Sequence, residues 1–386
     1  MYAGSYYFYS HTMGVTNAMP PQPPRIHGGP DRFGAALHDF STNSNACAPC
    51  PAAQAAVRQA DASQYPDASY SALRQELADF HGVDPYRVVL AASASEFIFR
   101  ITALTAQMAQ TEGQGGTVWL PPHSYGDYAQ AARAHKLVVS ANPDAAQLLW
   151  ACEPSSPLGL AQAGLEKMAS TLVASRTSPP SVGAELARRD FSRRSFAGTD
   201  PLCVLDRAYE PLRLGGAPTL TTAQLQSVWQ LWTPNKGLGL TGVRAAYAIA
   251  PLHAEATVVA LDQLSPSWPV GAHGVALLQA WTRPDVQAWL AESLVTLRKW
   301  KARQIDVCES LGWLCLPSDA NFFCAKPALP GGLNLESALT HLRKHGIKLR
   351  DTTSFGLPGH VRVSVQPPLA QDALKMAWTT LDAIKN

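Results

Sequence analysis

The sequence predicts an α/β protein with a mainly parallel central sheet flanked by helices and a smaller α+β region at the C-terminus. Two observations indicate this fold class. From residue 52 onward, segments with apolar residues at helical spacing alternate with short apolar runs typical of buried strands. The chain of 386 residues, with 46% hydrophobic and 16% charged residues, can also bury a large core and form more than one domain.

The elements follow one another along the chain, with Tyr65-Pro66-Asp67 as the break between the first two helices. In order, the sequence predicts helices at 52–60 and 71–80, a strand at 88–93, a helix at 96–108, a strand at 117–121, a helix at 131–137, strands at 137–141 and 147–154, a helix near 164–175, strands at 202–206, 228–232 and 245–250, and a long helix near 285–311. Ligands bind such sheets just beyond the carboxyl ends of the strands, so we expect the functional residues there.

Three regions are expected from these patterns. Residues 1–32 carry many prolines and no periodicity, which indicates an extended N-terminal arm. Residues 33–270 would form a large domain around the alternating helices and strands. Residues 271–386, which contain the long helix and a final αβ segment, would form a smaller domain.

Charge and cysteine content exclude several classes of partner. The 31 Lys and Arg nearly cancel the 29 Asp and Glu, leaving +2, so no overall field attracts nucleic acid or an anionic membrane. The N-terminus lacks the pattern of a signal peptide, and no apolar run reaches the roughly 18 residues of a membrane helix. The seven cysteines are odd in number and lack zinc-site spacing, so we expect reduced thiols, no metal and a cytoplasmic protein.

The most informative segment is LWTPNKGLGLTGVR, residues 231–244. Lys236 follows a predicted strand, Thr233 precedes it by three residues, and Arg244 follows in a Gly-rich loop. A lysine amine can form a Schiff base with pyridoxal phosphate, while a hydroxyl and a guanidinium can hold the phosphate of that cofactor. A single lysine in a turn is more often a surface residue. The segment therefore indicates a cofactor site only in combination with a second feature.

That second feature is Asp206, which ends the apolar run LCVLD about thirty residues upstream. A buried carboxylate needs a cationic partner. The protonated pyridine nitrogen of pyridoxal phosphate is such a partner, and its protonation makes the ring an electron sink. Asp206 alone would more often cap a strand end. Together with Lys236 at a successive strand end, it favours a cofactor site.

Further motifs flank these two residues in a characteristic order. They are His27-Gly-Gly, Asp39-Phe-Ser-Thr-Asn-Ser-Asn45, Tyr65-Pro-Asp, Ala94-Ser-Glu96, Tyr125-Gly-Asp-Tyr128, Pro154-Ser-Ser-Pro-Leu-Gly159, Asp206-Arg-Ala-Tyr209, Ala320-Asn-Phe-Phe323, and Arg350 with Arg362. Each is weak alone, but over about residues 27–380 their order and spacing resemble the fold-type I pyridoxal-phosphate enzymes. The resemblance is to the class I/II aminotransferase family, in the branch of histidinol-phosphate aminotransferases and threonine-phosphate decarboxylases.

The resemblance implies pyridoxal 5′-phosphate as the cofactor and roles for the residues around its ring. Asp206 would pair with the ring nitrogen, and Tyr209 would donate to the phenolic oxygen. Lys236 would be both the Schiff-base lysine and the proton shuttle. Tyr128, also a candidate catalytic residue, would stack on the ring, although core packing is the commoner role of such a tyrosine.

The resemblance also implies how the cofactor phosphate is held. Ala94 and Ser95 would give backbone amides at a helix N-terminus, and Thr233 and Arg244 would add a hydroxyl and a guanidinium. Tyr65 would reach the phosphate of the neighbouring subunit, which makes the expected protein a homodimer with shared sites.

For the substrate, Arg362 is expected to clamp a carboxylate bidentately. Arg350 and His27 are candidates for binding a second anionic group such as phosphate. Asn45 and Asn321, which lie in two of the matching motifs, complete the substrate-binding candidates. His27 could equally belong to a polar arm, and Arg362 taken alone could form a surface ion pair.

The chain departs from the family pattern at several positions. The family amide that binds the cofactor's phenolic oxygen is replaced by the hydroxyl of Ser156, and the usual Glu after the aspartate is Arg207. Asn235 precedes the lysine where Thr or Ser is usual, and residues 91–93 replace a Gly-Asn-Gly. The essential Lys and Asp are retained.

Three functions are therefore open. We expect an aminotransferase of amino-acid metabolism that acts on an amino acid or amino-acid phosphate. A decarboxylase of the threonine-phosphate type, from the cobalamin pathway, is the alternative, because His27-Gly-Gly resembles those members more closely. A catalytically inactive binding protein of the same fold is a third reading, and the retained Lys236 and Asp206 argue against it.

Overall fold

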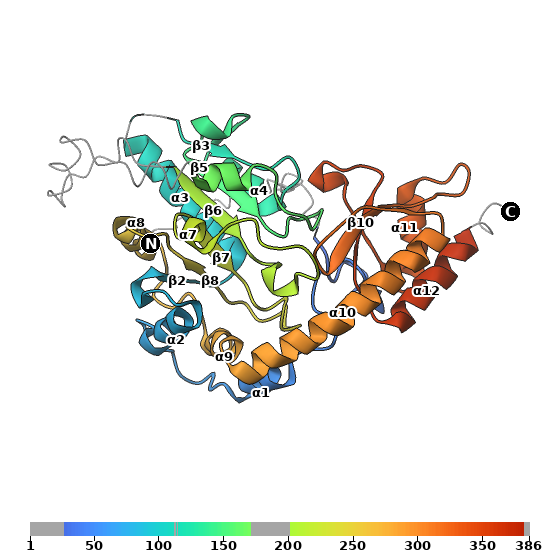
Figure 1. The fold of residues 1–386 in the computed structure, drawn as a ribbon, viewed down its shortest axis with the longest axis horizontal. Coiled ribbons are helices and arrows are strands. Elements are labelled where there is room, and N and C mark those ends of the chain that lie inside the picture. The colour runs from blue at the N-terminus through green and yellow to red at the C-terminus, as the bar shows by residue number, and fades with distance from the viewer. Residues whose placement is uncertain (1–26, 112, 114, 171–200, 382–386) are drawn as a thin grey trace, which may run out of the picture.

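The central element is a seven-stranded sheet, seen in the computed structural model, which describes residues 27–111, 113, 115–170 and 201–381 (Figure 1). Its strand order is β2-β8-β7-β6-β5-β3-β4, with β8 antiparallel to both of its neighbours and all other pairs parallel. The strands are β2 (Val88–Ala91), β3 (Thr117–Trp119), β4 (Val138–Ser140), β5 (Leu148–Cys152), β6 (Leu202–Asp206), β7 (Trp229–Trp232) and β8 (Ala246–Ile249). The predicted mainly parallel sheet is confirmed.

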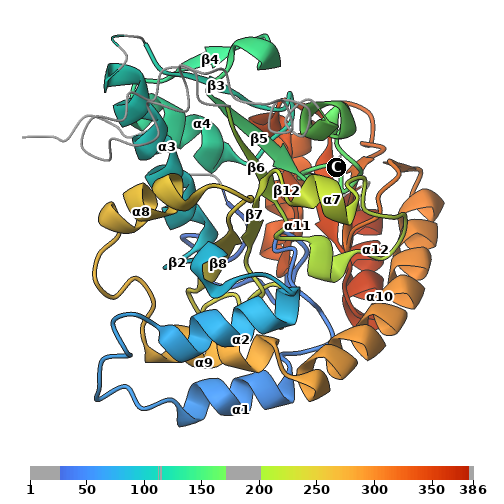
Figure 2. The same ribbon diagram turned by 60° about the vertical axis from the view of Figure 1, so that its left-hand side comes forward.

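Helices cover both faces of this sheet, so its central strands are buried along their whole length. One face carries α3 (Ala94–Thr111), α4 (Gly126–Ala134) and α8 (Glu255–Gln263), and the other carries α1 (Pro51–Gln59), α2 (Ser71–His81) and α9 (Ala272–Trp281). Figure 2 shows α1, α2 and α9 gathered on one side of the sheet. In β8, alternate residues pack into the two cores: Ala246 and Ala248 face the first, and Tyr247 and Ile249 face the second.

A second, smaller sheet forms near the C-terminus. It is antiparallel with the order β12-β13-β10-β9, and a separate pair joins β1 to β11. The elements are β1 (His38–Asp39), β9 (Leu314–Cys315), β10 (Phe322–Lys326), β11 (Ile347–Lys348), β12 (Arg350–Asp351) and β13 (Val361–Ser364), with α11 (Leu335–Lys344) and α12 (Pro368–Thr379). The 27-residue helix α10 (Pro284–Ser310) runs from α9 to this part of the molecule (Figure 1).

Short helical segments complete the described chain. They are α7 (Thr222–Leu225), η1 (Pro85–Arg87), η2 (Pro143–Ala145), η3 (Glu210–Leu212) and η4 (Thr353–Phe355). Residues 165–170 are helical where the sequence predicts a helix near 164–175, and the rest of that prediction lies outside the described residues.

The packing differs from the domain boundary expected at residue 270. Leu277 of α9 and Leu290 of α10 belong to the core beneath the large sheet, because α9 lays its apolar side against α1 and α2. The strand β1, expected in the large domain, pairs instead with β11 of the smaller part. Of the arm predicted over residues 1–32, only residues 27–32 lie within the described chain.

Two further observations concern the expectations on membranes and thiols. None of the helices in the described ranges combines the length and the apolar character that a bilayer crossing requires. All seven cysteines are free thiols, and five of them are buried.

The role of α9 in the larger core can be tested by a matched pair of leucine substitutions. Leu277→Ala should lower the free energy of unfolding by about 2–5 kcal/mol, because Leu277 is fully buried and its truncation leaves a cavity. Leu369→Ala, at a 77% exposed position of α12, should change it by less than about 0.5 kcal/mol. Urea unfolding measures both, and equal effects would contradict the packing of α9.

Candidate functional site

The sequence-predicted residues converge on one edge of the large sheet. Because β8 is antiparallel to both β2 and β7, strands β2, β3, β5, β6 and β7 all run in the same direction, and their carboxyl ends meet at that edge. At this edge lie Ser95 in the first turn of α3, Ser156 in the loop after β5, Asp206 at the end of β6 and Lys236 in the loop after β7. The topology therefore brings together residues that are up to 141 positions apart in sequence.

Asp206 is the last residue of β6, and its carboxylate is 5% exposed. Oδ2 accepts a 2.6 Å hydrogen bond from the Tyr128 hydroxyl, and Oδ1 accepts a 2.9 Å bond from the Ala208 amide. Burial raises the pKa of Asp206 above its usual value, while Tyr128, Ala208 and the charge of Lys236 oppose that shift. A carboxylate desolvated to this degree gains most from a cationic partner.

The place of Tyr128 differs from the expected stacking role. Its ring is fully buried and stacks on Trp150, with centroids 4.3 Å apart and an interplanar angle of 10°. Its hydroxyl is committed to Asp206. Tyr128 thus orients the carboxylate from behind, and its enclosed ring offers no face to a ligand.

Tyr125, which the sequence analysis did not select, is the better placed aromatic ring. It is only partly buried, it lies edge-on to Tyr128 at 5.8 Å, and its hydroxyl is 3.4 Å from Ser95 Oγ. Tyr125 precedes α4 as its N-cap residue, whereas Tyr128 lies in the first turn and faces the core. The motif Tyr125-Gly-Asp-Tyr128 contains both rings. Which ring is partly open and which is buried depends on the residue at which α4 begins.

Lys236 lies in the loop after β7 and is half-buried. Its Nζ is 5.3 Å from the centroid of the Tyr209 ring. The Tyr209 hydroxyl receives a 3.4 Å bond from Asn43 Nδ2, and Asn43 Oδ1 is buried without a hydrogen-bond partner in the described chain. The amine, the phenol and the amide therefore surround one polar region next to Asp206.

The N-terminus of α3 is built to leave two amides available. Ser93 Oγ accepts from the Glu96 amide at 3.1 Å, and the Glu96 carboxylate accepts from the Ala92 amide at 3.1 Å. This reciprocal capping starts the helix at Ala94, two residues before the predicted start. The amides of Ala94 and Ser95 are the first two of the helix and have no acceptor within it, which suits an anion.

Thr233 and Asn235 join the lysine loop to the Gly-rich loop after it. Thr233 Oγ1 donates to Asn235 Oδ1 at 2.7 Å, and Asn235 Nδ2 donates to the carbonyls of Thr241 and Val243. The unusual Asn235 therefore holds the loop that leads to Arg244. Arg244 itself is exposed and lines a surface hollow of about 330 Å³ with residues that include Val57, His273 and three glycines.

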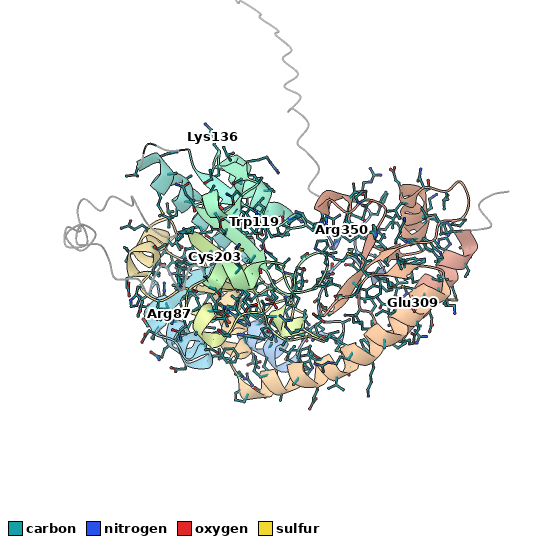
Figure 3. All side chains as sticks on the ribbon, turned by 45° about the horizontal axis from the view of Figure 1, so that its top comes forward. Arg87, Trp119, Lys136, Cys203, Glu309 and Arg350 are labelled. Atoms are coloured by element: carbon teal, nitrogen blue, oxygen red, sulfur yellow. The ribbon has the colours of Figure 1, made fainter. Side chains whose placement is uncertain are left out.

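Two buried arginines come from the smaller sheet. Arg350 and Arg362 are 5% and 6% exposed, and both guanidinium groups lie over the Phe355 ring, at 4.7 and 5.3 Å. Burial and the neighbouring charge of Arg362 lower the pKa of Arg350 to about 10. Figure 3 shows Arg350 on the side of the smaller sheet that is turned toward the larger one. Two cations held together in this way favour an anionic ligand.

Arg362 also connects to the rest of the site. Its Nη1 donates to Ser156 Oγ at 3.1 Å, and its Nη2 donates to the Ser41 carbonyl at 3.2 Å, while its Nε is buried without a partner among the described residues. The Phe322 ring lies 4.8 Å from the Tyr209 ring and 5.5 Å from the Arg362 guanidinium. Arg362 is therefore one ring away from the tyrosine beside Lys236.

The motif His27-Gly-Gly lies against the same region. A Cβ on Gly28 would be 2.2 Å from the Ser41 carbonyl oxygen, so only glycine allows this approach, and the Gly29 amide donates to Ser41 Oγ at 3.0 Å. His27 is exposed, with its ring centroid 6.2 Å from that of Tyr125.

Three other expected site residues lie differently. Both polar atoms of Asn45 have protein partners, because Nδ2 donates to the Gly237 carbonyl and Ser293 Oγ, and Oδ1 accepts from the Cys47 amide. Asn45 therefore braces the lysine loop. Asn321 Nδ2 donates to the Ser44 carbonyl, while its Oδ1 is buried and unpartnered within the described ranges.

Tyr65 is 78% exposed and stacks on Trp268, away from the other site residues of its own chain.

The departure at Arg207 does not alter this site. Its guanidinium lies 4.4 Å from the centroid of the Trp232 ring, donates to Gln230 Oε1 and pairs with Glu210. The side chain therefore belongs to packing beside the sheet, although it directly follows Asp206.

The donor set fits pyridoxal phosphate. A buried carboxylate can face a cationic ring nitrogen, Tyr209 and Ser156 can donate to a phenolic oxygen, and the start of α3 can bind a phosphate. The amine of Lys236 is available for covalent attachment. In the described ranges, no group of three or more His, Cys, Asp or Glu side chains is arranged to hold a metal ion.

Comparison with known proteins gives consistent matches. The sequence pattern of the family "Aminotransferase class I and II" matches residues 36–162 and 202–381. A histidinol-phosphate aminotransferase of Jannaschia sp. (strain CCS1) is 27% identical over 355 residues, which cover 89% of this chain and 91% of that protein.

Two solved structures show the same fold at low identity. The histidinol-phosphate aminotransferase of Sinorhizobium meliloti in complex with pyridoxal-5′-phosphate has a TM-score of 0.67 at 20% identity and covers 89% of this chain and 90% of its own. L-threonine-O-3-phosphate decarboxylase of Porphyromonas gingivalis has a TM-score of 0.66 at 19% identity, with 88% and 98% covered. At these identities the likeness establishes the fold and does not distinguish the two reactions.

The burial of Asp206 predicts a pH-dependent stability in the protein without cofactor. The pKa of Asp206 in the folded state is raised above the value of 3.8 expected in the unfolded chain. Its contribution to the stability of the folded state is therefore fully present below about pH 3.8, and it is lost as the pH rises through the folded pKa. Asp206→Asn removes this penalty. The variant should gain unfolding free energy relative to the parent at pH 7, and the gain should shrink toward pH 4.

Asp31→Asn is the matched control of opposite sign. Hydrogen bonds from Arg343 lower the pKa of Asp31, so its charged form stabilises the folded state and the same substitution should destabilise the protein at pH 7. Chemical unfolding at both pH values measures the two variants. A loss of stability for Asp206→Asn at pH 7 would contradict the assignment of Asp206 as a desolvated carboxylate.

Proposed function

The chain belongs to the class I and II aminotransferase family, whose cofactor is pyridoxal 5′-phosphate, and we propose that it transfers the amino group of an amino-acid phosphate. The observation that carries the substrate class is the pair of buried guanidinium groups, Arg350 and Arg362, beside the cluster of Asp206, Tyr209 and Lys236. An amino-acid phosphate and a dicarboxylic amino acid both bring two anionic groups, one for each of these guanidinium groups.

The residues of the large sheet would hold the cofactor and move protons. Bound at this edge, pyridoxal phosphate supplies an electron-withdrawing ring next to the α-carbon of the substrate. Asp206, fixed by Tyr128 and Ala208, would balance the charge of the ring nitrogen. Lys236 is the proposed attachment point, and its amine, beside the Tyr209 phenol, can carry a proton to and from the substrate.

Cofactor binding would use three further groups. The first amides of α3, at Ala94 and Ser95, would hold the phosphate, and Thr233 would join them when its hydroxyl turns away from Asn235. Tyr125 would cover the ring in place of Tyr128, because it is the partly open member of the pair. Ser156, whose Oγ accepts from Arg362, keeps its own proton to donate to the phenolic oxygen.

Substrate recognition would divide between the two arginines. Arg362 would clamp a carboxylate of the amino donor, and its unpartnered buried Nε indicates capacity for a further acceptor. Arg350 would meet the second anionic group. The name of the similar proteins, histidinol-phosphate aminotransferase, suggests an amino alcohol phosphate as one substrate to test.

Decarboxylation of an amino-acid phosphate is the second candidate. The observation in its favour is the placement of His27, which the close contact between Gly28 and Ser41 holds beside Tyr125. An imidazole there would add a third donor for a phosphate group. The two reactions start from the same complex and differ in which bond at the α-carbon breaks.

Product analysis with the purified holoenzyme tests the proposal. Incubation with an amino-acid phosphate or glutamate should convert the cofactor to its pyridoxamine form and release a keto acid. Release of carbon dioxide without a keto acid would exclude transamination and favour decarboxylation. Absence of visible absorbance after cofactor addition would support a non-catalytic protein.

The attachment point is tested in the same preparation. Borohydride should fix the cofactor on a peptide that contains Lys236, and Lys236→Ala should abolish this adduct. Lys299→Ala, at an exposed position of α10, should leave it unchanged. A labelled peptide that contains another lysine would refute the assignment.

The exposed aromatic pair supports the proposal that the active form is a homodimer. Tyr65 and Trp268 stack at 4.4 Å, and Trp268 Nε1 donates to the Pro66 carbonyl at 3.0 Å, which fixes both rings on the surface. Tyr65 has no role in the site of its own chain. It would instead complete the phosphate site of a second copy.

Subunit complementation tests this sharing. Tyr65→Ala and Lys236→Ala should each reduce activity by at least tenfold. In a mixed dimer, one site would combine an intact Lys236 with an intact Tyr65 from the other subunit, so mixing and refolding the two variants should restore a part of the activity. No recovery in a demonstrated mixed dimer would refute the shared site.

A further inference from the structure

One polar contact joins the loop after β3 to the turn that carries Phe355. His123 Nδ1 is 2.7 Å from the Phe355 carbonyl oxygen. Because a carbonyl only accepts, Nδ1 carries the proton and donates. The imidazole also lies against Gly356, where a Cβ would be 3.5 Å from Nδ1 and where φ is +75°. His123 thus contacts the backbone of the turn, at Phe355 and Gly356.

The turn beyond this contact is the support of the arginine pair. The Phe355 ring lies under both guanidinium groups, and Ser354 Oγ accepts from Arg350 Nη2 at 2.7 Å. Within the turn, Thr352 Oγ1 donates to the Leu357 and His360 carbonyls. A displacement of Phe355 would therefore move the surface on which Arg350 and Arg362 both rest.

His123, the donor in this contact, lies close in sequence to residues of the proposed cofactor site. His123 is two residues before Tyr125, whose hydroxyl is 3.4 Å from Ser95 Oγ at the start of α3. The segment from β3 to α4 thus contacts, through Tyr125, the end of α3 that would hold the cofactor phosphate. His123 is the member of this segment that bonds to the turn below the arginines.

We propose that His123 is a positioning residue that fixes the arginine pair relative to the cofactor site by holding the Phe355 turn. This inference rests on the proposed function, in which Arg350 and Arg362 bind the anionic groups of the substrate. Two like charges in a buried site repel each other, so their separation depends on the ring over which both lie. A substrate anion bridges them well only at one separation, and the His123 bond maintains it.

The predicted consequence is a defect in anion binding with little effect on cofactor binding. Loss of one neutral hydrogen bond to a carbonyl corresponds to a change of about three- to tenfold in an equilibrium constant. His123→Leu, which fills similar space without a donor, should raise KM for an amino-acid phosphate by about that factor. The dissociation constant of inorganic phosphate, measured by competition on the holoenzyme, should rise equally, and kcat should stay within about twofold.

His123→Asn is the matched variant. Its Nδ2 lies close to the position of the imidazole Nδ1 and can donate to the same carbonyl, so KM and the phosphate dissociation constant should return to within about twofold of the parent. Equal defects in the Asn and Leu variants, at unchanged unfolding midpoints, would overturn the proposal. So would an unchanged phosphate affinity in the Leu variant. If the Leu variant unfolds early, a weakened phosphate affinity in a stable Asn variant overturns it.

Arg362→Lys separates this inference from the proposed function. If Arg362→Lys leaves phosphate and substrate binding unchanged, the arginine pair is not the anion site and the proposed substrate class fails. If Arg362→Lys weakens binding sharply and His123→Leu does not, the arginines bind the anion without help from His123. In both Leu and Lys variants the visible absorbance of the holoenzyme should remain that of the parent.

Discussion

The burial of the Asp206 carboxylate is the constraint around which the larger sheet is arranged. A charged group with 5% exposure at the end of a central strand requires donors from several directions. Tyr128 from α4 and the Ala208 amide supply two of them, and the charge of Lys236 approaches from the loop after β7. These groups come from the connections after β3, β6 and β7, so the carboxylate can be satisfied only when the carboxyl ends of these strands meet at one edge of the sheet.

The second half of the site depends on α10 and the smaller sheet. This helix starts in the core beneath the large sheet and ends beside β9, so it sets where the smaller sheet is placed (Figure 1). Arg350 and Arg362 face each other on β12 and β13, in an antiparallel register that pairs their Cα positions. Contacts of Arg362 with Ser156, and of His123 with Phe355, then join the two parts.

The residue types and their strand-end positions were predictable because each follows from local pattern. Asp206 and Lys236 end apolar runs, and a parallel sheet brings such ends to one edge. The choice between Tyr125 and Tyr128 was not predictable in this way. Both lie in one short motif, and only the point at which α4 begins decides that Tyr128 turns into the core against Trp150. The bracing contacts of Asn45 were not predictable for a similar reason, since Gly237 and Ser293 lie far from it in the sequence.

The sequence by itself determined the chemistry: the alternation of apolar segments, and the lysine and aspartate at strand ends. These are properties of single segments, and each is set by local spacing or by the size of one side chain. Only the tertiary structure decided which side chains meet. It placed two arginines over the Phe355 ring, His123 against the turn that carries this ring, and Tyr65 on the surface. Such contacts depend on how α10 positions the two sheets relative to each other. The sequence pattern of a single segment does not specify this relative position.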